Sequence, residues 1–339
     1  MSTASNSFER LPHFLRTSRC TATVGVVGAL TVVLLAGTAQ AATAPLSDAT
    51  VKTHFDLAAG QTPENITPDR NGSVDVTFAL SHQVARISAS GRTTVLATLP
   101  APADPKAAAP VLGFSIVAGL VRDGDRFYVA YATGTKAETG IWTFTEGKAP
   151  TKFADLPATG APNAVTMNRK TGTLYVTDPV KGAVYSVPTR GSHRGDATVL
   201  ASGKSLKAVS YLGVNGAKVR GQNLYVTNLD QGTILRAPLT GKKTGSFQTV
   251  ASGLAGIDDF AFTGRGNQLL AAIQPASQVV LVNLKKVGRT TKARTVLTQK
   301  DGLSNPSSVA VVGRKVFVTN AAYSTQKDPN LLTALLAQD

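Results

Sequence analysis

A four-residue motif, mostly apolar and ending in threonine or alanine, recurs along this chain at a nearly constant interval. Its copies begin roughly 45 to 53 residues apart, an interval typical of a propeller or a solenoid. The copies begin at Val74, Phe127, Leu174, Leu224, Leu269 and Val316. An aromatic residue occupies the same place in several copies, which predicts packing between neighbouring repeats.

Each repeat contains several runs with β-strand character. A turn containing glycine precedes each motif, and another apolar run lies before that turn. A second β-like run follows the motif, and a third follows in five repeats. Four-stranded units at this period are typical of propeller blades. The sequence therefore predicts an all-β fold, a six-bladed propeller with four-stranded antiparallel blades.

The sixth repeat lacks its last strand before the chain ends. Residues 51–56 have β character and no place in the first repeat. We expect this N-terminal strand to close the ring, because closure would remove an exposed sheet edge. A solenoid would instead need polar capping repeats, and the sequence shows none.

The first 41 residues have the features of a secretory signal peptide. Arg10, Arg16 and Arg19 precede an apolar run over residues 24–35, and Ala39-Gln40-Ala41 fits a signal peptidase site. The alternative is a retained membrane anchor, for which the apolar run is short. We expect secretion to the extracellular space or cell envelope, with residues 42–339 forming the single propeller domain.

Cysteine content and charge exclude some kinds of partner. Cys20 is the only cysteine and lies in the predicted signal peptide, so the mature chain would have no disulfide and no cysteine metal ligand. The net charge is +15, but the basic residues are dispersed. They either form a solvated surface or attract an anionic partner such as a cell-wall polymer. No basic run is interleaved with aromatics, so a nucleic-acid partner is not expected.

Polar residues recur at one position, about ten residues before the motif, where the innermost strand should begin beside the central channel. Two carboxylates and two amides on one axis suit a hard cation, and calcium prefers such oxygen ligands. The alternative is that these residues simply form turns, as Asn and Asp often do. The six positions are Glu64, Ala118, Asn163, Asn215, Asp258 and Ser307.

Around these positions the chain resembles the senescence-marker-protein/gluconolactonase (regucalcin-like) family. The matching segments are Pro63-Glu64-Asn65, Pro162-Asn163-Ala164, Asn215-Gly216 and residues 256–260 around Asp258. The resemblance implies a six-bladed propeller with one divalent cation, held by Glu64, Asn163, Asn215 and Asp258. It also implies lactone hydrolysis, with Asp258 as ligand and general base and Asn163 positioning the substrate near the metal.

Three positions depart from the pattern of the sugar lactonases in that family. Ala161 stands where they carry a substrate-binding arginine, Ala164 where they carry aspartate, and Asp259 where they carry glycine. These departures make a sugar lactone doubtful as the substrate. An apolar lactone or an ester is equally compatible.

Other catalytic arrangements have less support. His54, His82 and His193 are isolated in sequence, so we expect surface histidines rather than a zinc site or a catalytic triad. The leading hypothesis is a secreted, calcium-type metal-dependent hydrolase acting on a lactone or ester. The alternative is a non-catalytic secreted propeller that binds a protein or an anionic cell-surface polymer, with a purely structural metal.

Overall fold

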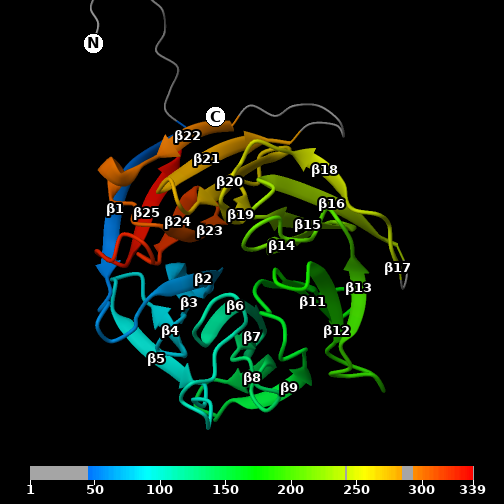
Figure 1. Ribbon diagram of the computed structural model, residues 1–339. Coiled ribbons are helices and arrows are strands. Elements are labelled where there is room, and N and C mark those ends of the chain that lie inside the picture. Colours follow the sequence, from blue (N-terminus) through cyan, green and yellow to red (C-terminus); the bar gives the residue numbers. More distant parts are fainter. Residues whose placement is uncertain (1–44, 241–242, 285–292, 339) are drawn as a thin grey trace, which may run out of the picture. The chain divides into compact units, whose positions relative to one another are not determined.

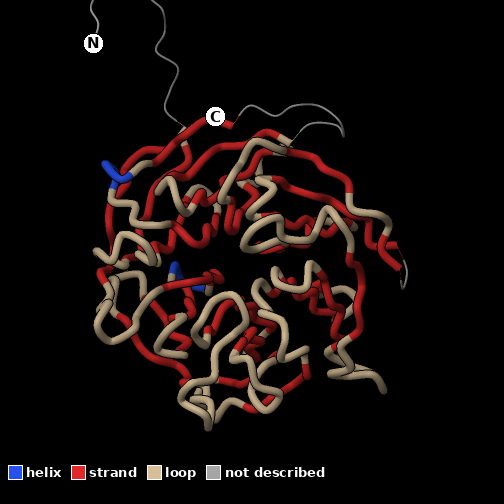
Figure 2. The backbone as a smooth tube through the Cα atoms, viewed as in Figure 1, coloured by secondary structure: helices blue, strands red, loops and turns tan. Residues whose placement is uncertain are grey.

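The computed structural model describes residues 45–240, 243–284 and 293–338. Six antiparallel sheets follow one another around a central channel, and almost all regular structure is strand (Figures 1 and 2). The prediction of a six-bladed propeller with four-stranded blades is therefore confirmed.

In blades one to five the strands run in chain order from the channel outward (Figure 1). Blades one to three contain β2 (Pro63–Pro68), β3 (Val74–Phe78), β4 (Gln83–Ile87) and β5 (Thr93–Thr98); β6 (Ile116–Asp123), β7 (Arg126–Ala132), β8 (Gly140–Thr145) and β9 (Thr151–Asp155); and β10 (Val165–Asn168), β11 (Thr173–Asp178), β12 (Ala183–Pro188) and β13 (Thr198–Ser202). Blades four and five contain β14 (Val214–Arg220), β15 (Asn223–Asn228), β16 (Thr233–Thr240), the short β17 (Lys243–Thr244) and β18 (Gln248–Ala251); and β19 (Ile257–Phe262), β20 (Gln268–Ile273), β21 (Gln278–Asn283) and β22 (Ala293–Leu297). Two single-turn 3₁₀ helices, η1 (Arg70–Gly72) and η2 (Gln299–Asp301), lie in connections.

Blade six combines the two ends of the described chain. It contains β23 (Pro306–Val312), β24 (Lys315–Asn320) and β25 (Asn330–Leu336), with β1 (Leu46–His54) as the outer strand. β1 pairs with β25 antiparallel, from Leu46 opposite Leu336 to His54 opposite Asn330. This strand begins five residues earlier than the expected run at residue 51.

The hydrophobic core lies mainly between blades. Six clusters of buried side chains each combine residues from two neighbouring blades. The repeated aromatic position contributes Tyr128, Tyr175, Tyr225 and Phe317 to four of them, and each ring is at most 8% exposed. The predicted role of these aromatics in packing between repeats is confirmed.

Tight hairpins join the inner strands to their neighbours, as the glycine turns predicted. Gly221 joins β14 to β15 with φ +58°, and Gly313 joins β23 to β24 with φ +57°. Only glycine adopts this conformation without steric cost.

In the part of the chain that the structure describes, no helix is long and apolar enough to cross a membrane. The predicted signal peptide, residues 1–41, lies outside the described residues, and so does its apolar run.

Candidate functional site

One end of the channel opens into a cavity of about 370 Å³. Glu64 on β2, Asn163 just before β10, Asn215 on β14 and Asp258 on β19 all line it. The structure thus brings together the four residues that the sequence selected. The two other axial positions are Ala118, which is fully buried, and Ser307, whose hydroxyl donates to the carbonyl of Pro63 at 2.7 Å.

Irregular pairing of the inner strands turns these side chains toward the axis. In β2, β14 and β19 the register with the next strand shifts across residues 63–66, 214–217 and 257–260. Such bulges redirect a side chain that a regular strand would point elsewhere. Glu64, Asn215 and Asp258 each lie inside one of these bulges.

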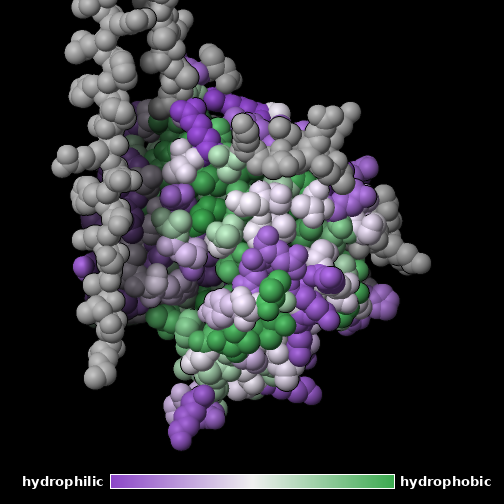
Figure 3. Space-filling view, turned by 45° about the horizontal axis from the view of Figure 1, so that its top comes forward, coloured by the Kyte–Doolittle hydropathy of each residue, from purple (hydrophilic) through white to green (hydrophobic). Residues whose placement is uncertain are grey.

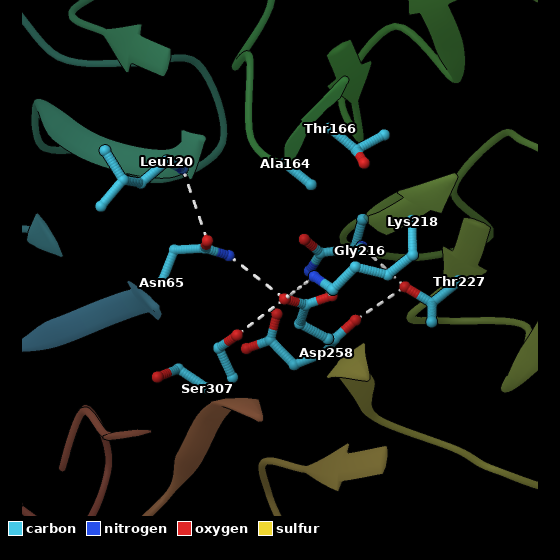
Figure 4. Close-up of polar contacts among 12 residues, drawn as sticks. Asn65, Leu120, Ala164, Thr166, Gly216, Lys218, Thr227, Asp258 and Ser307 are labelled. Atoms are coloured by element: carbon cyan, nitrogen blue, oxygen red, sulfur yellow. Dashed lines mark hydrogen bonds and ion pairs between the residues drawn. The ribbon is translucent and has the colours of Figure 1, made fainter. Parts of the chain in front are cut away.

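The threonine of the repeated motif ties these bulges together across blades. In blade four, the Thr227 hydroxyl accepts from the backbone N–H of Gly216 at 2.7 Å and donates to the backbone carbonyl of Asp258 in blade five at 2.7 Å (Figure 4). Thr177 links the amide of Ala164 to the carbonyl of Asn215 in the same way. The motif therefore fixes the backbone that carries the site.

Two buried carboxylates face this cavity. Glu64 is 7% exposed and Asp258 is 4% exposed. Burial, with the charge of Asp259 adding to it, raises the pKa of Glu64 to about 7, although hydrogen bonds from Tyr323 and Asn163 oppose the shift. Burial and then the charge of Glu64 raise the pKa of Asp258 well above its usual range. The charge of Glu64 thus makes Asp258 harder to ionise.

Both carboxylates also receive hydrogen bonds from neutral donors. The Tyr323 hydroxyl donates to Glu64 Oε2 at 2.6 Å, and Gln274 Nε2 donates to Asp258 Oδ2 at 3.1 Å. Burial beside Glu64 raises the pKa of Tyr323, so the phenol stays a donor. Neither partner carries a positive charge to balance the two acids.

The donor set fits a hard divalent cation. Asn215 is 3% exposed, and among the described residues its Oδ1 has no hydrogen-bond partner. A buried amide oxygen without a donor normally costs free energy, and a cation would satisfy it. Together with the carboxylates of Glu64 and Asp258 it supplies the oxygen ligands that calcium prefers. The described residues contain no cluster of three or more His, Cys, Asp or Glu side chains arranged for a metal.

Asp259 follows Asp258 directly but belongs to a different environment. Its carboxylate accepts from Lys218 Nζ at 2.5 and 2.7 Å, from Ser308 Oγ at 2.7 Å and from Asn65 Nδ2 at 3.2 Å. Figure 4 shows Asn65 and Lys218 reaching this point from different blades. We call these four residues the axial plug.

A second cavity of about 300 Å³ is lined by later residues of the inner strands, and Asn65 and Lys218 of the axial plug belong to its lining. Gly216 permits the packing of the axial plug, because a Cβ there would meet Asp259 Oδ1 at 2.7 Å. Asp259 does not line the cavity that contains Asp258.

Sequence reasoning missed Gln274 and Tyr323. Gln274 lies two residues beyond the fifth copy of the motif, and it is the only polar residue at that place among the six repeats, so the register could have found it. The equivalent residues are Ala79, Ala132, Pro179, Leu229 and Ala321. Tyr323 lies in the connection between β24 and β25, residues 321–329, which is longer than the equivalent connections of the other blades and gives no periodic signal.

The expectation of surface histidines is wrong for His82. Its ring is half-buried and contacts Ser115 Oγ at 2.8 Å and the Tyr131 hydroxyl at 3.2 Å. Burial lowers the pKa of His82. Neither His82 nor Ser115 lines the cavity that contains Glu64 and Asp258. His54 and His193 are exposed, as expected, and each pairs with an aspartate.

Ala161, one of the three departures, is buried and its backbone N–H donates to Asp178 Oδ1 at 3.0 Å. The methyl group lies in an apolar cluster with Ile116 and Ala118. At this position the chain therefore has a small buried side chain, and not the long basic side chain of the sugar lactonases.

Comparison with known proteins supports the fold. Regucalcin from Agrobacterium tumefaciens, described as a calcium-binding protein, is 16% identical with a TM-score of 0.58, over 84% of this chain and 95% of that one. A gluconolactonase from Xanthomonas campestris is 16% identical with a TM-score of 0.58, over 86% and 96%. The PQQ-bound aldose sugar dehydrogenase from Streptomyces coelicolor is 11% identical with a TM-score of 0.60, over 87% and 100%.

No family model matches the chain, and no curated protein matches it in sequence. At such low identities the structural likeness establishes the propeller fold. The neighbours include a gluconolactonase and a calcium-binding protein, but their activities belong to them and come to this chain only as a proposal.

Proposed function

We propose that this protein is a divalent-cation-dependent hydrolase that opens lactones or cleaves carboxylic esters, related to the regucalcin-like propellers. The observation that carries the proposal is Asn215 Oδ1, which is buried and has no hydrogen-bond partner among the described residues, on a side chain that lines one cavity with Glu64 and Asp258. The presence of a regucalcin and a gluconolactonase among the structural neighbours supports it.

Glu64, Asn163, Asn215 and Asp258, which all line the cavity, would hold the cation. Two carboxylates balance the charge of a divalent ion, and calcium accepts the mixture of carboxylate and amide oxygens. When bound, the cation would polarise the substrate carbonyl as a Lewis acid.

Asp258 would act as the general base. A water molecule adds to the carbonyl carbon and gives one proton to the Asp258 carboxylate. The bond between the carbonyl carbon and the ring or ester oxygen then breaks, and the proton passes to that leaving oxygen. The products are a hydroxy acid from a lactone, or an acid and an alcohol from an ester. Asn163, which donates to Glu64, would orient the substrate at the cavity edge.

A substrate screen tests the proposal. Protein lacking residues 1–41 is freed of metal with a chelator and assayed on a panel of lactones and esters, with and without added calcium, magnesium, manganese or zinc. We expect hydrolysis that depends on one of these cations. Asp196→Asn is the control, because Asp196 is exposed and lies in blade three between β12 and β13. This variant should leave the activity unchanged. Absence of any cation-dependent hydrolysis would falsify the proposal.

The non-catalytic alternative predicts a different result. If the cation only stabilises the ring, it should raise the unfolding temperature without supporting turnover. The protein would then bind a protein or an anionic cell-surface polymer through its +15 charge. Retention on isolated cell-wall material that moderate salt abolishes would favour this alternative.

We further propose export through the signal peptide at residues 1–41. N-terminal sequencing of the protein recovered from the culture medium should begin at Ala42. Recovery of the intact N-terminus from the membrane fraction would instead support a retained anchor.

A further inference from the structure

The cavity is lined by side chains of two kinds. Glu64, Asn215 and Asp258 are at most 7% exposed, and we call them its floor; we call the apolar and aromatic lining side chains its walls. Leu80, Phe114 and Tyr211 are 39%, 37% and 48% exposed and come from three separate connections. Figure 3, which views one side of the molecule, shows apolar side chains exposed in patches among polar ones.

The apolar wall continues into the protein interior. Ile116 and Leu212 also line the cavity and are 4% and 7% exposed. Ile116 belongs to a buried cluster that contains Ala118 and Ala161, and Leu112 packs against that cluster. This wall is therefore anchored in the core.

Three polar side chains that line the cavity already have partners within the protein. Gln274 donates to Asp258 and Tyr323 donates to Glu64. Gln326 Nε2 donates to the carbonyl of Tyr323 at 2.5 Å, within its own loop. Among the described lining residues there is no lysine, arginine, serine or threonine.

This arrangement discriminates between substrates. A ring with several hydroxyl groups would bury them against Leu80, Phe114 and Leu212 without partners, which is costly. An alkyl or aryl group would instead leave water for an apolar surface, which is favourable.

Building on the proposed hydrolase function, we infer that the substrate is an apolar lactone or ester, with its carbonyl at the floor and an alkyl or aryl group against Leu80, Phe114 and Tyr211. The loops that carry these three residues set the specificity.

A series of lactones with unbranched alkyl substituents tests the inference, with glucono-δ-lactone as the polar comparison. We expect kcat/KM to rise roughly fourfold for each added methylene until the chain leaves the cavity. Glucono-δ-lactone should be the poorest substrate. If it is hydrolysed faster than every alkyl lactone, the inference is wrong although the hydrolase function stands.

Two variants test whether the wall residues cause the dependence of kcat/KM on alkyl chain length. Phe114→Ser and Tyr211→Ser should flatten the dependence of kcat/KM on chain length, because each removes apolar surface that the alkyl group contacts. Val199→Ser is the matched control, because Val199 is an apolar residue 60% exposed on the outer strand β13, and it should keep the full dependence. Thermal unfolding checks that all three variants are folded. An unchanged dependence in both wall variants would contradict the assignment.

A binding measurement separates this inference from the proposed function. Calorimetric titration with 2-heptylcyclopentanone, a ketone that cannot be hydrolysed, reports on the wall without turnover. Saturable binding that Phe114→Ser weakens at least fivefold supports an apolar site even if no substrate is cleaved. Absence of saturable binding by the wild-type protein overturns the inference even if some ester is hydrolysed.

Discussion

Asp258 and Asp259 are neighbours in sequence and both almost fully buried, yet their surroundings are opposite. Asp258 faces a second carboxylate, Glu64, and receives one neutral hydrogen bond from Gln274. Asp259 lies in the axial plug, where it receives both a charged donor, Lys218, and two neutral donors. The bulge in β19 lets two consecutive side chains enter these two environments.

The difference indicates that the Asp259 carboxylate has a structural role, whereas the Asp258 carboxylate is available to bind a proton or a cation. A buried charge is tolerated when an opposite charge and hydrogen bonds surround it, as at Asp259. Among the described residues, no positively charged side chain is in direct contact with Asp258 or Glu64, so the balance must come from protons or from a cation. Burial with incomplete compensation is characteristic of functional sites.

The largest effect should come from replacing the two aspartates separately. Asp258→Asn should lower kcat/KM by about 10² to 10⁴-fold, the usual contribution of a general base. It should also make the cation-free protein more stable at pH 8, because it removes a buried charge from beside Glu64. Rate assays and urea unfolding on the same preparation measure both effects.

Asp259→Asn is the matched comparison. It leaves Lys218 without its charged partner and should lower stability while retaining more turnover than Asp258→Asn. If Asp259→Asn is the variant that loses turnover and keeps stability, the roles of the two residues are reversed.

Calcium should stabilise the protein by binding to Glu64 and Asp258, whose buried carboxylates have no positive charge in contact with them among the described residues. At about a thousand times the dissociation constant, a ligand adds roughly 4 kcal/mol to the free energy of unfolding. For a domain of this size that shift corresponds to about 10 °C in the unfolding midpoint. Differential scanning calorimetry after chelation and after addition of calcium measures it.

Asn215→Leu should abolish the calcium shift without destabilising the cation-free protein, since Asn215 Oδ1 has no partner to lose among the described residues. If calcium, magnesium, manganese and zinc all leave the wild-type midpoint unchanged, the four polar residues are ordinary turn formers.

Breaking the ion pair between Lys218 and Asp259 should change the free energy of unfolding by somewhat less than calcium binding does. Lys218→Met leaves the Asp259 carboxylate, which is 3% exposed, without a counter-charge. Removing one partner of a buried pair costs 3 to 5 kcal/mol, and the 27% exposure of Lys218 brings the expected loss to about 2 to 3 kcal/mol. Urea unfolding at pH 7 measures the loss.

The double variant Lys218→Met with Asp259→Asn is the control for this prediction. It should recover much of the stability, because no charge is then left unpaired. A single Lys218→Met variant as stable as the wild type would show that the ion pair does not support the axial plug.

The smallest effect is a dependence of stability on pH. The pKa of Glu64 in the folded protein is about 7, above its ordinary value of 4.5, so the folded state holds a proton that the unfolded state has already lost. The stability of the cation-free protein should therefore fall as pH rises from 4.5 to 7, by about 2 kcal/mol. Thermal unfolding at a series of pH values, with a chelator present, measures the slope.

Glu64→Gln should reduce that slope, which separates Glu64 from other groups that titrate in the same range. Because a cation displaces the proton, calcium should bind more tightly at pH 8 than at pH 5. A calcium affinity independent of pH would mean that Glu64 does not take part in binding.

Much of this structure could be predicted because the chain repeats. Equivalent residues in successive blades occupy equivalent places around the axis, so the register of the motif was sufficient to select Glu64, Asn163, Asn215 and Asp258 for one site. The same register assigned Tyr128, Tyr175 and Tyr225 to the contacts between blades. Periodic patterns predict periodic structure because each blade buries its faces against identical neighbours.

Features that occur in one blade and not in the others were decided by the tertiary structure. Tyr323 reaches Glu64 from the connection between β24 and β25, which is longer than its equivalents in the other blades. Lys218 of one blade meets Asp259 of the next, so no spacing in the sequence links either pair. His82 and Ser115 likewise meet only because two connections fold together. The sequence by itself determined the ring, its blades and the axial residues; the bulges and loops decided which charges are compensated, because a one-residue irregularity in a strand changes the side to which every following side chain points.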